Sequence, residues 1–288
     1  MTTLFRIMGA LVIAASLSVS LGAQWPSHPT PDVPRKDGKP ILDGPAPRTP
    51  EGKVDFSGIW NRFGGGGGGG RGRAGGGPPP PTTTADGIPL STFGEVAGRG
   101  FALPLQPWAA ELKKRRMADN NKDNPDVWCL PIGLMQYHNH PQPRQIVQTK
   151  NLILITYESN YGLRYIYMDG RPAPNNDPTP WWFGYSRGWF EGDTLVVETT
   201  NFRGDERAGW LDVNGSPYTE ALKMTERFRR PNFGTLEIDV TIDDPKAYTK
   251  PFTVRVNQRI MVDQEMIEFI CNENEQSSKH LEPPKKPL

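Results

Sequence analysis

The sequence predicts a mostly β protein, built as a single antiparallel barrel or strongly curved sheet with one packed helix and a Gly/Pro-rich insert. Runs rich in β-branched and aromatic residues recur in meander order, with turn signals about every 8–12 residues. The 30 prolines and 31 glycines interrupt any long helix. The eight Trp and eight Tyr side chains suit a β-rich core.

A β-hairpin is predicted at the centre of this sheet. Aromatic residues lead up to Glu191-Gly192-Asp193, and the β-branched run Thr194–Thr200 leaves it. Gly192 can take the positive φ that a short turn needs. We therefore expect paired strands over Tyr185–Phe190 and Leu195–Asn201.

The other strands are predicted from β-branched and aromatic content and from period-two alternation. The continuous apolar run Leu152–Ile155 predicts a strand that is covered on both faces. The predicted ranges are Val54–Phe63, Ile146–Tyr157, Leu163–Met168, Leu222–Arg229, Thr235–Ile242, Phe252–Arg259 and Glu265–Cys271.

One helix is expected over Leu105–Ala118. Trp108 and Leu112 fall at helical spacing, and basic residues gather in the last turn, where they complement the helix dipole. We expect this helix to pack on the outside of the sheet.

The remaining segments are read from composition. Residues 24–50 form a Pro-rich extended arm, Gly64–Pro81 is a flexible insert of low complexity, and residues 273–288 are a polar tail. No other break in composition divides the chain, so we expect one β domain over residues 51–272.

The first 23 residues have the pattern of a secretory signal peptide. Arg6 precedes an apolar run from Ile7 to Leu21, and small residues follow at Gly22-Ala23. A membrane anchor is the alternative, but the run is shorter than the ~20 residues that a spanning helix needs. We expect a secreted or periplasmic protein with no integral membrane segment in the mature chain.

Cys129 and Cys271 are the two cysteines of the chain. In an exported protein, two cysteines predict one disulfide, and two buried free thiols are the alternative.

Several motifs resemble those of a large family of uncharacterised exported bacterial proteins. The resemblance covers about Phe56 to Cys271 and implies export, but it implies no activity. One departure is Phe190, where the family pattern has Trp directly before Glu. The shared motifs are Pro107–Ala110, Cys129–Pro131, Ile146–Thr149, Asp169–Arg171, Trp189–Val197, Glu226–Phe228 and Asp243–Pro245.

A second, shorter resemblance is to lipocalin-like barrels. Asp55–Trp60 is similar to their opening strand, in which a Gly-x-Trp motif lets the chain bend and the Trp fills the closed end. The resemblance implies a barrel, and we expect it to bind a small ligand in its interior or at its mouth.

Charged residues on apolar strand faces are the candidate catalytic or binding groups. Glu198, Glu226 and Arg164 each share a face with apolar residues, so all three are expected to converge if those faces line one interior. A structural ion network, a polar ligand pocket and an acid–base pair formed by Glu198 and Glu226 are the three interpretations.

Two further groups of residues are candidate sites. Trp181, Trp182 and Tyr185 could form a stacking platform for sugars or flat apolar ligands, although aromatic residues are more often core. His138 and His140 are candidates for a metal site, but two histidines are too few ligands, so no metal or other cofactor is predicted.

We therefore predict an exported protein that binds a small apolar or sugar-like ligand. The alternatives are a carboxylate-pair enzyme, for instance a glycoside hydrolase or a lyase/isomerase, and a structural protein of the cell envelope. The formal net charge of +1 from 33 basic and 32 acidic side chains argues against a nucleic-acid partner. The sequence leaves the oligomeric state open.

Overall fold

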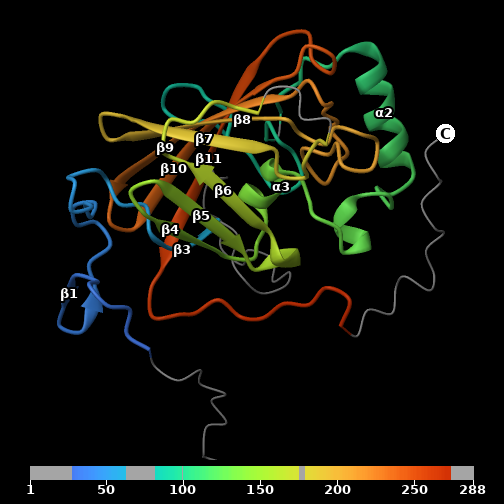
Figure 1. Ribbon diagram of the computed structural model, residues 1–288. Helices are drawn as coiled ribbons and strands as arrows, with labels where there is room; N and C mark the ends of the chain where they lie inside the picture. Colours follow the sequence, from blue (N-terminus) through green and yellow to red (C-terminus); the bar gives the residue numbers. More distant parts are fainter. Residues whose placement is uncertain (1–27, 63–81, 99, 175–178, 274–288) are drawn as a thin grey trace, which may run out of the picture.

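A closed β-barrel is the centre of the molecule (Figure 1), as the computed structural model of residues 28–62, 82–98, 100–174 and 179–273 shows. Within these ranges nine strands form the barrel, each beside its neighbours in the chain, and β11 pairs with β3 to close it. The strands are β3 (Gly58–Arg62), β4 (Arg144–Gln148), β5 (Leu152–Tyr157), β6 (Leu163–Tyr167), β7 (Tyr185–Glu191), β8 (Thr194–Thr200), β9 (Lys223–Asn232), β10 (Thr235–Asp243) and β11 (Phe252–Met261). The prediction of a mostly β barrel is confirmed.

One pair of neighbours departs from the antiparallel meander, because β6 and β7 run parallel. Strand directions cannot alternate all the way round a closed ring of nine strands, so one neighbouring pair has to be parallel. A parallel pair also needs a long connection that returns the chain to the starting end of the first strand. Residues 168–184 make that connection.

The predicted central hairpin is confirmed. β7 and β8 pair from Tyr185↔Thr200 to Glu191↔Thr194, and Gly192 has a φ of +61° in the turn between them. Two predictions about residues 146–157 are wrong. Ile146–Tyr157 is divided between β4 and β5, and Leu152 and Leu154 are half-buried on the outer face rather than covered.

Residues 265–271 form no strand, although Glu265–Cys271 was predicted to be one. β11 ends at Met261, and Asp263 has a φ of +60°, which turns the chain away from the sheet. The chain then runs as an extended segment to Cys271 (Figure 1). The signal peptide predicted over residues 1–23 and the insert Gly64–Pro81 lie outside the described residues, as does the tail beyond residue 273.

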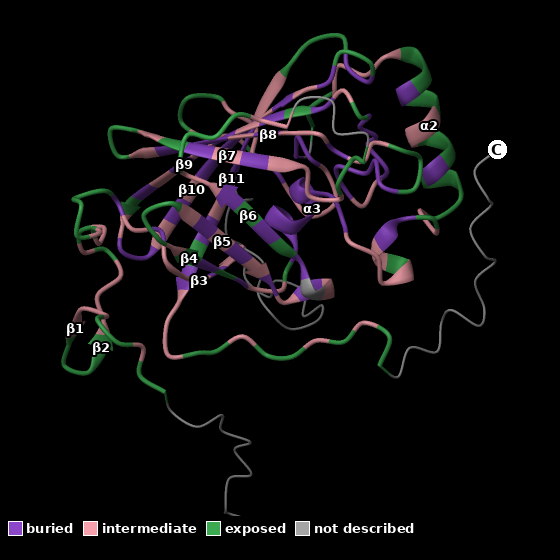
Figure 2. Ribbon diagram, viewed as in Figure 1, coloured by how far each residue is buried: buried purple, intermediate pink, exposed green. Residues whose placement is uncertain are grey.

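The two ends of the barrel differ. At the end that we call the turn end, short turns join β4 to β5, β7 to β8 and β9 to β10. At the opposite end, the loop end, residues 201–222 join β8 to β9 and residues 244–251 join β10 to β11. The short helix α3 (Leu134–Asn139) lies at the loop end, and all six of its residues are buried (Figure 2).

The barrel interior changes character between these ends. Toward the turn end it is filled by apolar side chains, among them Phe56, Trp60, Phe228 and Leu236. Toward the loop end, buried polar side chains point inward and form what we call the polar layer. Its members are His138 of α3 and the strand residues Arg144, Tyr157, Arg164, Ser186, Thr199, Glu226 and Gln258.

The predicted helix is α2 (Pro107–Ala118), which lies outside the barrel beside the β8–β9 loop (Figure 1). Its buried residues are Ala109 and Arg116, whereas Trp108 is 46 % exposed, so the expected apolar face is wrong at that position. The Arg116 guanidinium donates to the carbonyl oxygens of Glu206, Gly209 and Gly215. These hydrogen bonds of Arg116 therefore hold the last turn of α2 against the β8–β9 loop.

Other elements in the described ranges are small. They are the hairpin of β1 (Arg35–Lys36) and β2 (Lys39–Pro40) in the N-terminal arm, and the 3₁₀ helices η1 (Pro125–Trp128) and η2 (Ser159–Tyr161). None of the helices in these ranges has the length and apolar character needed to cross a bilayer.

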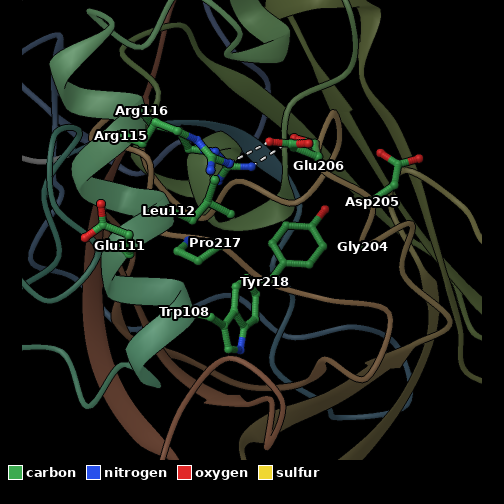
Figure 3. Close-up of a pocket in the computed structure, with 10 residues that line it drawn as sticks. All are labelled: Trp108, Glu111, Leu112, Arg115, Arg116, Gly204, Asp205, Glu206, Pro217 and Tyr218. Atoms are coloured by element: carbon green, nitrogen blue, oxygen red, sulfur yellow. Dashed lines mark hydrogen bonds and ion pairs between the residues drawn. The ribbon is translucent and has the colours of Figure 1, made fainter. Parts of the chain in front are cut away.

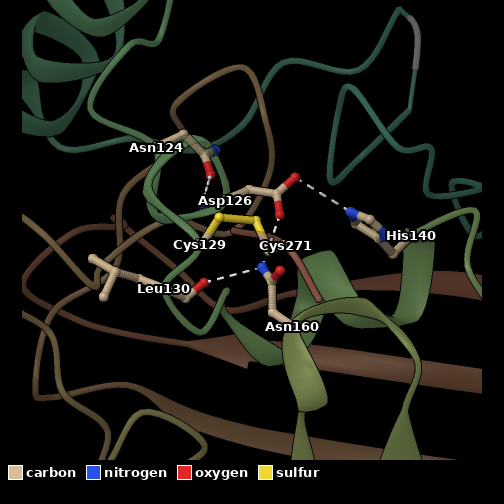
Figure 4. The surroundings of a disulfide bond; sticks show 7 residues. All are labelled: Asn124, Asp126, Cys129, Leu130, His140, Asn160 and Cys271. Atoms are coloured by element: carbon tan, nitrogen blue, oxygen red, sulfur yellow. Dashed lines mark hydrogen bonds and ion pairs between the residues drawn. A yellow bond between two sulfur atoms is a disulfide. The ribbon is translucent and has the colours of Figure 1, made fainter. Parts of the chain in front are cut away.

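The predicted disulfide is confirmed, since Cys129 and Cys271 are bonded. Figure 4 shows that the loop around Cys129 is itself fixed by side-chain hydrogen bonds. Asn160 Nδ2 donates to Asp126 Oδ1 (2.9 Å) and to the Leu130 carbonyl (3.2 Å). The bridge therefore ties the segment after β11 to a loop that is held against η2.

Reducing this disulfide should lower the free energy of unfolding by about 2–5 kcal/mol, because the unfolded chain is released from a long closed loop. The bridge joins residues that are 142 positions apart. The measurement is the midpoint of guanidinium denaturation with and without dithiothreitol, with Cys271→Ser as the matched variant. We expect dithiothreitol to shift only the wild-type midpoint. An unchanged wild-type midpoint would show that the bridge adds no stability.

Candidate functional site

Glu226 is the most deeply placed acidic group of the polar layer. It lies on β9 between Met224 and Phe228, which face the same interior, and it has no exposed surface. A carboxylate in such a position is tolerated only when its charge is matched and its oxygen atoms accept hydrogen bonds.

Arg164 and His138 are the partners of the Glu226 carboxylate. Arg164 Nη1 donates to Glu226 Oε1 at 2.9 Å, and Arg164 Nη2 donates to the other carboxylate oxygen. His138 Nε2 lies 2.6 Å from Glu226 Oε1. Arg164 also donates to Ser186 Oγ (3.0 Å) and to Thr199 Oγ1 (2.8 Å). We call these five residues the Glu226 network.

The electrostatics of the network follow from burial and pairing. Burial alone would raise the pKa of Glu226, but Arg164 and His138 outweigh burial and hold that pKa at about 2. Burial lowers the pKa of His138, and the bond to Glu226 offsets only part of that effect. A neutral imidazole therefore donates its Nε2–H to an ionised carboxylate, and Nδ1 is left as an acceptor.

The prediction that Glu198 shares this interior is wrong. Across β8 and β9 the residue opposite Glu226 is Val197, whereas Glu198 is opposite Thr225. Since successive side chains of a strand point to opposite faces, Glu198 points outward. There it pairs with Arg187 (2.7 Å) and Lys223 (2.5 Å), which together hold its pKa below the ordinary range.

The two histidines considered for a metal contact different carboxylates. His138 bonds Glu226, and His140 Nε2 lies 3.4 Å from Asp126 Oδ2. Within the described ranges, no group of three or more His, Cys, Asp or Glu side chains is placed to hold a metal ion.

The predicted aromatic platform is a column of rings that contact one another. Tyr185 packs between Tyr167 and Trp181, with ring centroids 5.1 and 5.3 Å apart. The ring of Trp182 instead contacts the guanidinium of Arg203, which lies 4.9 Å from the ring centroid. Trp181 is 38 % exposed, whereas Trp182 and Tyr185 are half-buried.

A pocket of about 460 Å³ lies between α2 and the β8–β9 loop (Figure 3). Its volume is within the range of small-molecule sites. Aromatic and apolar side chains form its lower part in the view, and charged side chains surround the upper part. The lining residues are Trp108, Glu111, Leu112, Arg115, Arg116, Gly204, Asp205, Glu206, Pro217 and Tyr218.

Contacts within the loop and to α2 give the pocket a defined shape. The guanidinium of Arg116 lies 3.9 Å from the ring centroid of Trp210, and Arg115 pairs with Glu206 at 3.0 Å across the pocket rim. Asp205 accepts from Arg203 Nε (2.6 Å) and from the Ala208 backbone N–H (2.9 Å), which shapes the loop. The pocket is therefore a product of the helix and the loop together.

The Tyr218 hydroxyl is the unusual group in this lining. It is buried, and within the described residues it has no hydrogen-bond partner. Burial raises the pKa of Tyr218, so the hydroxyl stays protonated and can donate.

Sequence reasoning placed Arg164 and Glu226 correctly on the inner face, but it missed two features. His138 was considered only as a metal ligand, although it directly follows Leu134–Tyr137, in which three of the four residues are apolar or aromatic, and this signals burial and hence a need for a partner. The pocket was missed because Trp108 and Tyr218 are far apart in the chain, and no local pattern joins them.

Replacing Glu226 by Gln should lower the free energy of unfolding at pH 7 by about 3–5 kcal/mol, because Arg164 is left buried without its counter-ion. The folded-state pKa of about 2 lies below the ordinary 4.5, so this stabilisation is present above pH 4.5 and is lost as the pH falls toward 2. The measurement is urea denaturation of wild type and variant from pH 7 to pH 3.

Glu198→Gln is the matched control, since a half-exposed ion pair contributes at most about 1 kcal/mol. The difference in the free energy of unfolding between wild type and Glu226→Gln should become smaller below pH 4.5. A Glu226→Gln variant as stable as Glu198→Gln at pH 7 would contradict the buried ion pair.

No family model matches the chain, and no curated protein or solved structure matches it either. The resemblances to an exported bacterial family and to lipocalin-like barrels stay predictions.

Proposed function

We propose that this chain is an exported binding protein that holds a small sugar-like ligand in the pocket between α2 and the β8–β9 loop. One observation carries the proposal: Trp108 and Tyr218 line one pocket with five charged side chains. Flat aromatic surface beside hydrogen-bonding groups suits a ligand with an apolar ring face and polar edges.

The charged side chains of the lining favour a hydroxylated ligand over an apolar one. Carboxylates accept hydrogen bonds from hydroxyl groups, and guanidinium groups donate to hydroxyl or ring oxygen atoms. Glu111 is exposed on α2, and Arg115 and Glu206 meet at the rim. A purely apolar ligand would remove these groups from water without replacing their hydrogen bonds.

Binding is favoured over acid–base catalysis by the positions of the carboxylates. Glu198 and Glu226 are on opposite faces of the barrel wall, so they cannot act on one substrate as a pair. In the pocket, Asp205 and Glu206 are each bonded to an arginine. These carboxylates are arranged to accept hydrogen bonds.

Export is supported by the disulfide and by the pattern of the first 23 residues. Disulfides form and persist in oxidising compartments. The bond between Cys129 and Cys271 therefore agrees with a secreted or periplasmic location.

Trp108→Ala should weaken sugar binding at least tenfold, because it removes one aromatic surface of the pocket. The measurement is isothermal titration calorimetry with glucose, galactose, N-acetylglucosamine, glucuronate and their short oligomers. Glu111→Gln, which exchanges a carboxylate for a neutral amide on the same helix, should also weaken binding.

Trp189→Ala is the matched control. Trp189 on β7 is exposed to a similar extent (42 %, against 46 % for Trp108), and both indole N–H groups donate to a neighbouring residue. Equal affinities for Trp108→Ala and Trp189→Ala, or no binding of any sugar in the panel, would contradict the proposal.

A further inference from the structure

Arg144 is a buried cation without a carboxylate partner. Its side chain is on the inner face of β4 and only 1 % exposed. Nη1 donates to the His138 carbonyl at 2.9 Å, and Nη2 to the His140 carbonyl at 3.4 Å. The Nε–H group has no hydrogen-bond partner among the described residues.

A second guanidinium lies near it. Arg62 is on the same face of β3 as Trp60, whose cross-strand neighbour is Arg144. Arg62 is half-buried and is close enough to lower the pKa of Arg144. Within the described part of the chain, neither arginine has a carboxylate within ion-pair distance, in contrast to Arg164 with Glu226.

Both arginines remain cationic in spite of burial. Burial is the main cause that lowers the pKa of Arg144, to about 10, and burial also lowers the pKa of Arg62. Two positive charges therefore lie on the same inner face at the loop end. Placing like charges close together in a site of low dielectric is costly unless an anion accompanies them.

Other buried arginines of this protein are satisfied differently. Arg116 and Arg230 each donate to three backbone carbonyl groups and pack against an aromatic ring. Arg144 has only two carbonyl partners and a second guanidinium close by. Arg144 therefore has fewer partners for its guanidinium than Arg116 or Arg230 has.

Tyr157 adds a neutral donor to the two cations. It is the cross-strand neighbour of Arg144 on β5. Its buried hydroxyl makes no hydrogen bond of ordinary geometry, and Arg164 lies near enough to interact with it. Burial raises the pKa of Tyr157, so the hydroxyl keeps its proton. Nearby, Arg164 donates to Glu226, Ser186 and Thr199, so the Glu226 carboxylate is already paired.

We propose that Arg62, Arg144 and Tyr157 form a binding site for a small oxyanion, such as a carboxylate, phosphate or sulfate group, at the loop end of the barrel. Guanidinium groups and a hydroxyl donor are the groups that bind oxyanions in proteins. Water could satisfy the unpaired donors, but it would leave both positive charges uncompensated. This site is separate from the pocket between α2 and the β8–β9 loop.

The test is thermal unfolding of the full chain in inorganic phosphate or sulfate, at ionic strength held constant with chloride. A ligand that binds only the folded state raises Tm along a saturating curve. We expect such a curve for wild type, at least a tenfold higher apparent Kd for Arg62→Gln, and a severalfold higher Kd for Tyr157→Phe. Neither change removes a side-chain hydrogen bond of ordinary geometry to a described residue, so both variants should fold.

Arg227→Gln is the control, because Arg227 is an exposed arginine that pairs with Glu191 on the outer face. Its saturation curve should match that of wild type. Phosphate and sulfate also stabilise proteins without a site, but that effect does not saturate and does not depend on Arg62. A wild-type response without saturation, or equal apparent Kd values for wild type and Arg62→Gln, would overturn the proposal.

Discussion

An ionised carboxylate inside an apolar barrel has to be paired, and the loop end of this protein is arranged around that requirement. Both carboxylate oxygen atoms of Glu226 accept hydrogen bonds, and the donors are Arg164 and His138. Arg164 comes from β6 and is itself held by Ser186 of β7 and Thr199 of β8. His138 comes from α3, so the network also fixes the helix that fills this end. Removing one partner leaves the other charge buried and unmatched.

The same constraint explains the division of the interior. Toward the turn end, Phe56, Phe228 and Leu236 pack without polar atoms in their side chains. Toward the loop end, polar groups from seven of the barrel strands and from α3 meet, because the long connections bring additional chain there. The pocket beside α2 is also built by one of those connections, the β8–β9 loop. Both proposed binding sites are therefore at the end where the chain departs from a regular meander.

Much of the barrel could be predicted from the sequence, because strand alternation and turn residues are local signals. Arg164 and Glu226 stood out as charges on apolar faces, and both are inside. The prediction that Glu198 lies inside the barrel failed because Val196 and Val197 are both buried. Alternation on β8 therefore does not distinguish the inner face from the outer one. The parallel pair β6–β7 follows from the odd number of strands in the closed barrel, and no local pattern in the sequence indicates which pair is parallel. The partnership of His138 and Glu226 spans 88 residues, and no local pattern encodes it.

The most direct test of this account is the protonation state of His138, measured by long-range ¹H–¹⁵N NMR of the histidine side chains. The chain has four histidines, and the signals of His138 are those that are missing from the spectrum of a His138→Gln variant. We predict a neutral ring at pH 6–8 (about one unit either side of neutrality), with the proton on Nε2, where it is donated to Glu226. A doubly protonated ring in that range, or a neutral ring with its proton on Nδ1, would contradict the network on which the loop end depends.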